Sequence, residues 1–203
     1  MTDKIEFEPT EDAWACTLED LCLSKLQIAM VVTGGGTGAI SRCLRRPGAS
    51  LNFVEAVVPY SRMATQEYLG FEPTEGYASQ QTAIALAQTA HHRAAALSNT
   101  PQQACGIALT ATLPTSAAGS DARLPQNCCV HVASQCEAIC RGWSLCFAAQ
   151  PSERAVSESI AEQIFLIALQ DSMHQHGFRI SSDPVQALNA AGLTVTLTDA
   201  KGT

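Results

Sequence analysis

A run of apolar residues followed at once by glycines constrains the fold of this chain more than any other stretch. Residues 28–32 read Ile-Ala-Met-Val-Val, and four glycines occur within residues 34–38. A short apolar run bounded by glycines is typical of a strand buried on both faces of a sheet. Residues 39–46 then predict a helix, which Pro47 and Gly48 end. In α/β proteins this order of elements presents backbone N–H groups to an anion.

The glycine turn matches neither of the common phosphate-binding fingerprints. A Walker loop ends in Gly-Lys-Ser or Gly-Lys-Thr, and this turn contains no lysine. A dinucleotide-binding turn follows the spacing Gly-x-Gly-x-x-Gly, whereas the turn here reads Gly-Gly-Gly-Thr-Gly. Two interpretations therefore stay open: a tight strand-to-helix connection without a ligand, or a turn whose backbone approaches and binds an anion.

Two further apolar runs predict two more buried strands. Residues 53–58 form one of them, and the polar triplet Pro-Tyr-Ser follows directly at 59–61. Residues 104–112 form the other, which ends in Thr-Ala-Thr at 110–112. Binding and catalytic side chains of open α/β sheets commonly stand at the ends of buried strands. We therefore expect these polar residues to belong to a site.

Periodicity and turn signals predict the remaining elements. Helices are expected at residues 11–24, 61–69, 78–97 and 152–176. An antiparallel hairpin is expected at residues 128–134 and 138–148, a short helix from Asp183 and an edge strand at 193–197. Alternating strands and helices that close with a hairpin predict an α/β protein, a three-layer α/β/α sandwich with a mixed, roughly five-stranded sheet.

The length of the chain and the absence of a long linker predict one domain over residues 1–203. Its core is expected at about residues 21–177, with a C-terminal extension of unassigned role at 178–203. Hydrophobic residues make up 46% of the sequence, which is enough to build a substantial core.

The charge balance argues against nucleic acid and membranes as partners. The formal net charge is -7 at pH 7, so the overall field of the chain does not attract nucleic acid or anionic lipid. No apolar run reaches the roughly 18 residues that a membrane-spanning helix needs. The first 25 residues are rich in Asp and Glu and lack the long apolar core of a secretory signal peptide. We therefore expect a cytoplasmic protein.

Nine cysteines in a cytoplasmic protein are expected to be reduced thiols. Cys136, Cys140 and Cys146, with His131 nearby, resemble a set of metal ligands at first sight. Their spacing matches no zinc module, and no Cys-x-x-Cys pair occurs in the chain. The cysteines are better interpreted as small buried hydrophobic residues, so we expect no metal.

Two closely spaced motifs make the chain resemble a known family. Pro-Gly-Ala-Ser at 47–50 precedes Pro-Tyr-Ser at 59–61 by eight residues, and Gly36 and Arg42 stand upstream. In these residues the chain resembles the C-terminal domain of the CinA (competence/damage-inducible) proteins, the nicotinamide-nucleotide amidohydrolase (NMN deamidase) family. The resemblance covers roughly residues 21–169. It looks like a divergent branch in which a Gly-Gly-Gly turn replaces the usual serine-bearing turn.

The resemblance implies a three-layer α/β/α fold and a cytoplasmic, usually oligomeric enzyme. The implied reaction hydrolyses the carboxamide of nicotinamide mononucleotide to nicotinate mononucleotide and ammonia, without a metal cofactor. The family uses a serine in the turn, a tyrosine at the end of the second strand and a lysine one helical turn further on. In this sequence the tyrosine is Tyr60, the serine position holds Thr33 and the lysine position holds Thr65.

These replacements leave two functions open. In the first, the chain is an amidohydrolase in which Thr33 attacks the amide and Tyr60 activates or orients it. A hydroxyl needs a base or cation to become a good nucleophile, and Arg62 cannot act as a base because guanidinium stays protonated. In the second, the chain is a binding or regulatory module that keeps the pocket and has lost the chemistry. A different reaction, with Glu55 or His131 as base, is a third alternative.

Both main functions predict a small-molecule, nucleotide-like ligand, and the resemblance implies a homo-oligomeric protein. The arginine cluster that includes Arg42 either contacts phosphate or forms a solvated helix face. The residues expected to contact the substrate or its phosphate are Gly34, Gly35, Gly36, Thr37, Gly38, Arg42, Ser50, Ser61, Arg62, Thr110 and Thr112.

Overall fold

The apolar run before the glycines forms a central strand of the sheet, as its composition predicts. The computed structural model describes residues 11–113, 128–147, 154–178, 189 and 193–201. Strand β1 (Gln27–Thr33) is buried throughout, except at its half-exposed first residue. It pairs in parallel with β2 (Phe53–Val57) on one side and with β3 (Ala104–Thr112) on the other. The three apolar runs therefore form strands as predicted, and the structure shows that they are neighbours in the sheet.

The second half of the sheet is antiparallel. The predicted hairpin is formed by β4 (Cys129–Cys136) and β5 (Ile139–Cys146), and β4 pairs with β3. The tail adds the outermost strand, β6 (Thr196–Lys201), which pairs with β5. The strand order is β2-β1-β3-β4-β5-β6. The sheet is mixed as predicted, but it has six strands rather than five, because the edge strand of the tail joins it.

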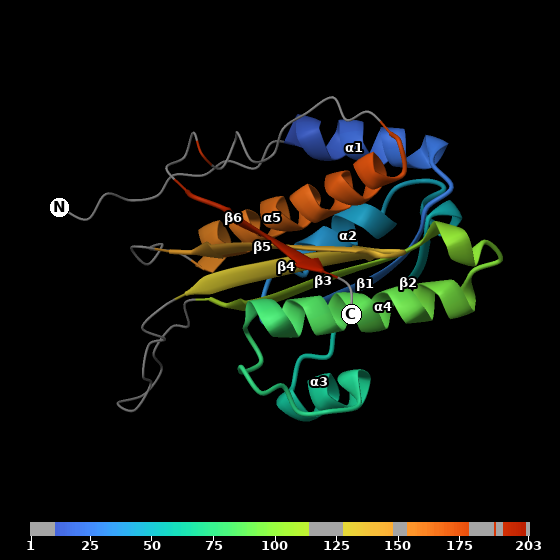
Figure 1. Ribbon diagram of the computed structural model, residues 1–203. Coiled ribbons are helices and arrows are strands. Elements are labelled where there is room, and N and C mark those ends of the chain that lie inside the picture. The colour runs from blue at the N-terminus through green and yellow to red at the C-terminus, as the bar shows by residue number, and fades with distance from the viewer. Residues whose placement is uncertain (1–10, 114–127, 148–153, 179–188, 190–192, 202–203) are drawn as a thin grey trace, which may run out of the picture.

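Helices cover both faces of the sheet, which confirms the predicted three-layer class (Figure 1). One face carries α1 (Glu11–Leu23), α2 (Gly38–Leu44) and α5 (Arg154–Gln175). The other face carries α4 (Gln80–Leu97), with the short α3 (Arg62–Leu69) beside it. Two 3-10 turns complete the elements, at Ala49–Leu51 and Pro101–Gln103. None of the helices described here is long and apolar enough to cross a membrane.

Small residues let α4 lie very close to the sheet. A Cβ atom at Gly106 in β3 would overlap the carbonyl oxygen of Ala87 and the amide nitrogen of His91, both in α4. The helix presents a row of fully buried alanines to the strands, Ala83, Ala87, Ala90 and Ala94. The alanine-rich composition of this helix therefore explains its close packing on the sheet.

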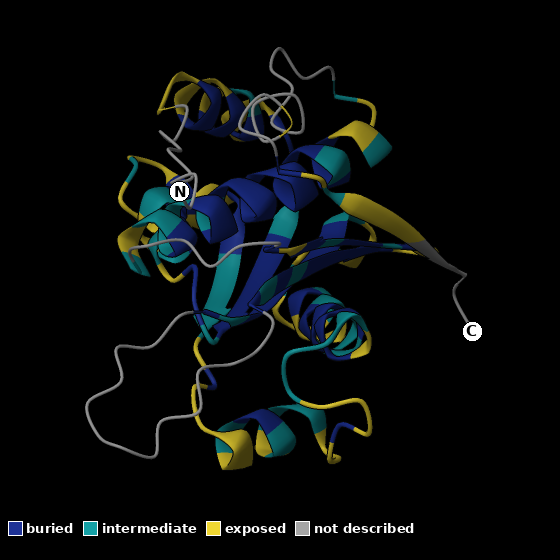
Figure 2. Cartoon of the chain, turned by 90° about the vertical axis from the view of Figure 1, so that its left-hand side faces the viewer, coloured by how far each residue is buried: buried dark blue, intermediate teal, exposed yellow. Residues whose placement is uncertain are grey.

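The opposite layer is thicker, because α1 packs over α5 and α5 packs over the sheet (Figure 2). Trp14 and Leu21 of α1 are buried in the same apolar cluster as Ile164 and Phe165 of α5. The core therefore begins before residue 21, because α1 covers a side of α5 that would otherwise face water. The short helix predicted from Asp183 falls outside the described residues, except at Asn189.

The prediction that all cysteines are reduced thiols is wrong for two of them. Cys129 and Cys146 form a disulfide across the β4–β5 hairpin. They stand directly opposite each other, with Cα atoms 4.1 Å apart. Directly opposed residues in an antiparallel pair approach to about 4.5 Å where they are not hydrogen-bonded to each other. Sequence spacing alone could not reveal this pair, because the register of the hairpin brings the two residues together.

Candidate functional site

The topology places a crevice at the carboxyl ends of β1 and β3. The chain leaves β1 through α2 on one face of the sheet and enters β3 from α4 on the other face. In open α/β sheets, such a change of direction leaves a crevice outside the ends of two neighbouring strands, where ligands bind. Thr33 at the end of β1 is the register partner of Thr110 in β3. Two of the predicted site residues therefore stand side by side at this edge.

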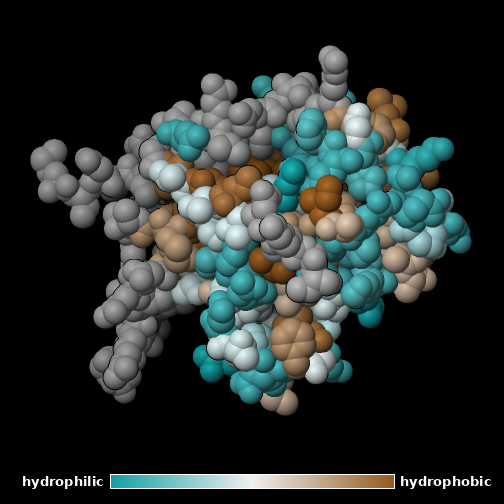
Figure 3. Space-filling view, in the orientation of Figure 1, coloured by the Kyte–Doolittle hydropathy of each residue, from teal (hydrophilic) through white to brown (hydrophobic). Residues whose placement is uncertain are grey.

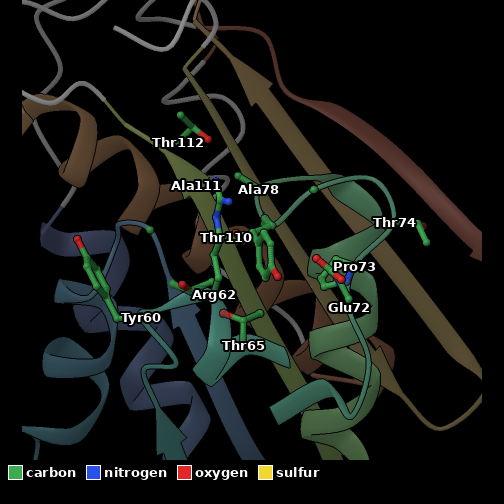
Figure 4. A pocket seen from close by; sticks show the side chains of 14 residues that line it. Tyr60, Arg62, Thr65, Glu72, Pro73, Thr74, Ala78, Thr110, Ala111 and Thr112 are labelled. Carbon is green, nitrogen blue, oxygen red and sulfur yellow. Dashed lines mark hydrogen bonds between the residues drawn. The ribbon is translucent and has the colours of Figure 1, made fainter. Parts of the chain in front are cut away.

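A cavity of about 620 Å³ occupies this crevice (Figure 4). Its size lies within the roughly 300–1,000 Å³ of typical small-molecule sites. We call it the strand-end cavity. The predicted site residues that line it are Thr33, Gly34, Tyr60, Arg62, Thr65, Thr110 and Thr112. The structure thus brings together all three residues carried over from the family's catalytic set.

Only glycine fits at position 34, where the turn after β1 lines the cavity. Its φ angle is +81°, a conformation that L side chains rarely adopt. A Cβ atom at this position would also overlap the carbonyl oxygen of Ala111, a residue of β3 that lines the same cavity. The turn after β1 therefore folds tightly against the end of β3, and Thr33 is held at the junction.

The hydroxyl groups of Thr33 and Thr65 are held by one backbone oxygen. Thr33 Oγ1 donates to the carbonyl of Pro59 at 3.1 Å, and Thr65 Oγ1 donates to the same carbonyl at 2.9 Å. Thr65 Oγ1 also lies 3.1 Å from the carbonyl of Ser61. A carbonyl oxygen orients a hydroxyl but is too weak a base to take its proton. Each hydroxyl keeps its lone pairs, so both remain able to accept hydrogen bonds from a ligand.

Tyr60 lies at the rim of the cavity rather than inside it. Its side chain is 67% exposed, and in Figure 4 it stands across the cavity from Thr74 and Glu72. The neighbouring Ser61 does not line the cavity, because its hydroxyl caps α3 by accepting a hydrogen bond from the amide of Ala64 at 3.1 Å. The polar triplet after β2 thus divides between the site and a helix cap.

The loop between α3 and α4 forms a wall of the cavity that the sequence did not reveal. Its lining residues are Glu72, Pro73, Thr74, Gly76, Tyr77 and Ala78. The carbonyl of Gly76 accepts hydrogen bonds from Thr82 Oγ1 at 2.6 Å and Ser79 Oγ at 3.2 Å, which ties the loop to the start of α4. Ser79 caps α4, since its hydroxyl accepts a hydrogen bond from the amide of Thr82 at 3.1 Å. The chain must cross the carboxyl edge of the sheet to pass from α3 to this cap. That required crossing is the signal in the sequence that could have placed the loop beside the site.

Tyr77 links this loop to β3 and to α3. Its carbonyl accepts a hydrogen bond from Thr110 Oγ1 at 2.7 Å, and its hydroxyl accepts one from Gln66 Nε2 at 2.6 Å. The guanidinium of Arg62 lies 5.4 Å from the centre of its ring, a cation–π contact. The contact orients Arg62 along the wall of the cavity, where its charge faces the space that a ligand would occupy.

The lining has few groups that could transfer a proton. Among the described residues, Arg62 and Glu72 are its charged members, and it includes no His, Lys or Cys. The two other bases considered from the sequence lie elsewhere. Glu55 pairs with Arg93, and His131 shares a hydrogen bond of 2.7 Å with Ser144.

A carboxylate of this chain, that of Glu158, binds the backbone of the glycine turn. The amide of Gly36 donates to Glu158 Oε2 at 2.5 Å. Glu158 also pairs with Arg154 at 2.9 Å, and Arg154 donates to the carbonyl of Gly34 at 3.2 Å. The residues after Gly34, namely Gly35, Gly36, Thr37 and Gly38, do not line the cavity. The turn does present an N–H group to an anion, but the anion comes from α5.

Arg42 and Ser50 also lie away from the strand-end cavity. Arg42 donates to Glu162 at 2.7 Å and to Glu11 at 2.8 Å, and its guanidinium lies 5.5 Å from the ring of Trp14. Hydrogen bonds to Glu11 and Glu162 raise the pKa of Arg42. Arg42 therefore joins α1, α2 and α5, and neither of the roles considered from the sequence describes it. Ser50 is exposed in the 3-10 turn before β2.

Comparison with known proteins finds a likeness in structure. No family model matches the sequence, and no curated protein matches it significantly. The structure is similar to a competence-damaged protein (CinA) superfamily protein from Escherichia coli, with 16% identity and a TM-score of 0.58 over 86% of this chain and 96% of that chain. It is also similar to the competence/damage inducible protein CihA from Agrobacterium tumefaciens, with 19% identity and a TM-score of 0.58 over 84% and 99% of the two chains.

A CinA superfamily protein from Enterobacter cloacae gives the same result, with 15% identity and a TM-score of 0.59 over 86% of this chain and 98% of that chain. The likeness extends over nearly the whole of each solved structure, whereas the sequence identities are low. The resemblance noticed in the motifs is thus confirmed at the level of the fold. The chain has the fold of the CinA superfamily.

Proposed function

We propose that this chain binds a small, polar, nucleotide-like molecule in the strand-end cavity and that binding, rather than catalysis, is its function. One observation carries the proposal. The hydroxyl groups of Thr33 and Thr65 hydrogen-bond to backbone carbonyls, those of Pro59 and Ser61, and a backbone carbonyl cannot take the proton. A hydroxyl nucleophile needs a neighbouring base or cation, and loss of a general base commonly costs about 10²–10⁴-fold in rate.

The lining suggests how such a ligand would be held. Arg62 supplies a cation in a fixed orientation, which suits a phosphate or carboxylate group. Thr33, Thr65 and Thr112 supply oxygen atoms that can accept hydrogen bonds from amide or amino groups of the ligand. Glu72, on the opposite side, suits a ribose hydroxyl or another donor. A ligand with an anionic group near Arg62 and hydrogen-bond donors near the threonines would be a nucleotide-like molecule.

A second candidate function is hydrolysis of a carboxamide such as that of nicotinamide mononucleotide. It is favoured by the position of Thr33, which ends β1 beside Gly34 at the place where the resembling family carries its serine. In this reaction Thr33 Oγ1 would attack the amide carbon and the backbone N–H of Gly34 would stabilise the oxyanion. Tyr60 would need to turn inward from the rim to orient the hydroxyl.

Calorimetry with nicotinamide mononucleotide, together with an ammonia-release assay at high protein concentration, tests both functions. Binding without ammonia release, weakened at least tenfold in Arg62→Gln, is the outcome expected from the proposal. The matched control is Arg45→Gln, which removes an exposed arginine outside the cavity. Ammonia release that disappears in Thr33→Val would establish hydrolysis instead. Absence of both binding and release would reject this ligand class.

We further propose that the protein is a cytoplasmic homo-oligomer. β2 is an edge strand, and large apolar side chains near it and around α3 are exposed, including Leu51, Val58, Met63 and Phe71. Figure 3 shows apolar side chains exposed over the α3 region among mostly hydrophilic ones. An unpaired edge with apolar neighbours is a common subunit contact. A light-scattering mass equal to the 21.5 kDa of one chain would reject the oligomer.

A further inference from the structure

A pair of thiols lies at the opposite end of the sheet from the strand-end cavity. Cys105, near the start of β3, is the register partner of Cys136, the last residue of β4. Their sulfur atoms are 3.0 Å apart. Thr110 lies five residues further along β3, which corresponds to about 17 Å in a strand. The thiol pair is therefore separate from the proposed ligand site.

The two thiols differ in their access to small solutes. Cys136 lines a surface cavity of about 440 Å³ together with His176. Cys105 is completely buried and lies behind Cys136 in the apolar core. A small reagent that enters this cavity therefore meets Cys136 first, and Cys105 is in position to react only with Cys136.

His176 is oriented as a partner for the Cys136 thiol. It follows the last turn of α5, and its Nδ1 atom donates to the carbonyl of Ser172 at 2.9 Å. That hydrogen bond places the ring proton on Nδ1 and leaves Nε2 as an acceptor. Hydrogen bonds with Cys105 and His176 lower the pKa of Cys136, and the hydrogen bond with Cys136 raises the pKa of His176. Both directions favour a thiolate–imidazolium pair.

The other free thiols lack this combination. Burial raises the pKa of Cys43, Cys128 and Cys140, so they stay protonated. Cys16 and Cys22 are exposed, and neither contacts a second thiol among the described residues. Cys22 does contact Arg46, so it is the natural competitor for an oxidant. Oxidation of Cys22 would have no neighbouring thiol to resolve it, which makes its product distinguishable.

We propose that Cys136 is a redox-active thiol that a small hydroperoxide oxidises and that Cys105 resolves. The Cys136 thiolate attacks one peroxide oxygen, the O–O bond breaks, and the leaving hydroxide takes a proton from His176 to become water. The product is a sulfenic acid at Cys136. Cys105 then attacks that sulfur and loses its thiol proton, the S–O bond breaks, and the leaving hydroxide takes that proton to become a second water. Two thiols are oxidised to one disulfide while one hydrogen peroxide is reduced to two waters.

The geometry is close to that of the product. A disulfide needs a sulfur–sulfur distance of about 2.05 Å, so the pair must approach by roughly 1 Å. The two residues belong to adjacent, directly opposed positions of one sheet, and small side-chain rotations supply such a movement. The hairpin already carries one cross-strand disulfide, Cys129–Cys146, formed by directly opposed residues at the other end of β4.

The experiment treats the full-length chain with a small excess of hydrogen peroxide, blocks the remaining thiols, and maps disulfides by non-reducing peptide mass spectrometry. We expect a Cys105–Cys136 linkage that dithiothreitol reverses. In Cys105→Ser we expect a sulfenic acid at Cys136 that dimedone traps. In His176→Gln the linkage should form at least ~10-fold more slowly, because an ordinary cysteine is only a few per cent thiolate at pH 7.

Cys140→Ser is the matched control. It removes a buried thiol of the same hairpin, in a different apolar cluster from Cys105 and Cys136. The Cys105–Cys136 linkage should form in this variant at the same rate as in the unmodified chain. Oxidation of Cys22 before Cys136 would overturn the proposal. So would an unchanged linkage rate in His176→Gln, or the lack of any Cys105–Cys136 linkage. If Cys105→Ser fails to fold, the linkage in the unmodified chain and the His176→Gln rate still decide the matter.

Discussion

Thr33 and Thr65 donate hydrogen bonds to the same backbone oxygen, that of Pro59. One of them ends β1 and the other lies in the first turns of α3, so a single carbonyl joins the central strand to the helix beside the cavity. Both side chains are nearly fully buried. The arrangement explains how two threonines can serve the structure of the site without forming a catalytic pair.

The shared carbonyl predicts non-additive mutations. Thr33→Val and Thr65→Val should each lower the free energy of unfolding by about 1–2 kcal/mol, because each loses a buried hydrogen bond while Pro59 keeps one donor. The double variant should lose about 1 kcal/mol more than the sum, because the buried carbonyl then has neither donor. Urea denaturation of the four proteins measures this coupling.

Thr89→Val is the control for the threonine variants, because Thr89 Oγ1 donates only to the carbonyl of Ala85 within its own helix, at 3.0 Å. It should change stability by less than about 0.5 kcal/mol. Strict additivity of Thr33→Val and Thr65→Val would contradict the shared acceptor.

The Tyr77 ring should matter for ligand affinity through Arg62. Tyr77→Leu removes the surface on which the guanidinium lies, and the cation–π contact is worth about 0.5–1 kcal/mol at a partly exposed site. We expect the dissociation constant of an anionic ligand to rise about two- to fivefold in calorimetry. Tyr77→Phe keeps the ring and loses only the hydrogen bond from Gln66, so its affinity should stay closer to that of the unmodified chain. Equal losses in both variants would assign the effect to the loop rather than to Arg62.

The glycine turn should depend on Glu158. Glu158→Ala leaves the amide of Gly36 without its acceptor and Arg154 without its partner, and we expect a loss of about 1–2 kcal/mol in the free energy of unfolding. Glu158→Gln keeps an oxygen acceptor for Gly36, so it should lose less than half as much. Thermal and urea unfolding distinguish the two. A larger loss in Glu158→Gln than in Glu158→Ala would show that the charge, not the hydrogen bond, holds the turn.

The contribution of His131 to the stability of the protein should be lost in mildly acidic solution. Burial lowers the pKa of His131, so the unfolded chain binds a proton at this residue more readily than the folded chain. The stabilisation from the neutral ring is therefore complete above the unfolded pKa of about 6.5 and is lost as the pH falls below it toward the folded pKa.

Urea midpoints compared at about pH 7.5 and pH 5.5 test this pH dependence, because that interval spans the unfolded pKa of histidine. His131→Asn should show a smaller decrease between the two conditions than the unmodified chain. His91, whose pKa burial also lowers, contributes in the same direction, so part of the decrease should remain. A decrease that His131→Asn leaves unchanged would remove His131 from the explanation.

The sequence by itself determined the elements whose signals are local. The apolar run of β1, the cap at Ser79 and the glycine that ends α3 act through residues within one or two turns, so the predicted bounds agree closely with the structure. Recognition of the fold also followed from short motifs at the strand ends. Thr33, Tyr60 and Thr65 were named from the resemblance, and they lie around one cavity because the parallel strands β1 and β2 bring their carboxyl ends together.

Only the tertiary structure decided which distant groups meet. Glu158 fills the glycine turn because α5 crosses it, and Tyr77 walls the cavity because its loop must pass over the sheet edge. Cys129 meets Cys146, and Cys105 meets Cys136, through the registers of two strand pairs. A shift of one residue in register would separate both pairs. Such contacts depend on the relative placement of whole elements, which burial of the core fixes and no local pattern records.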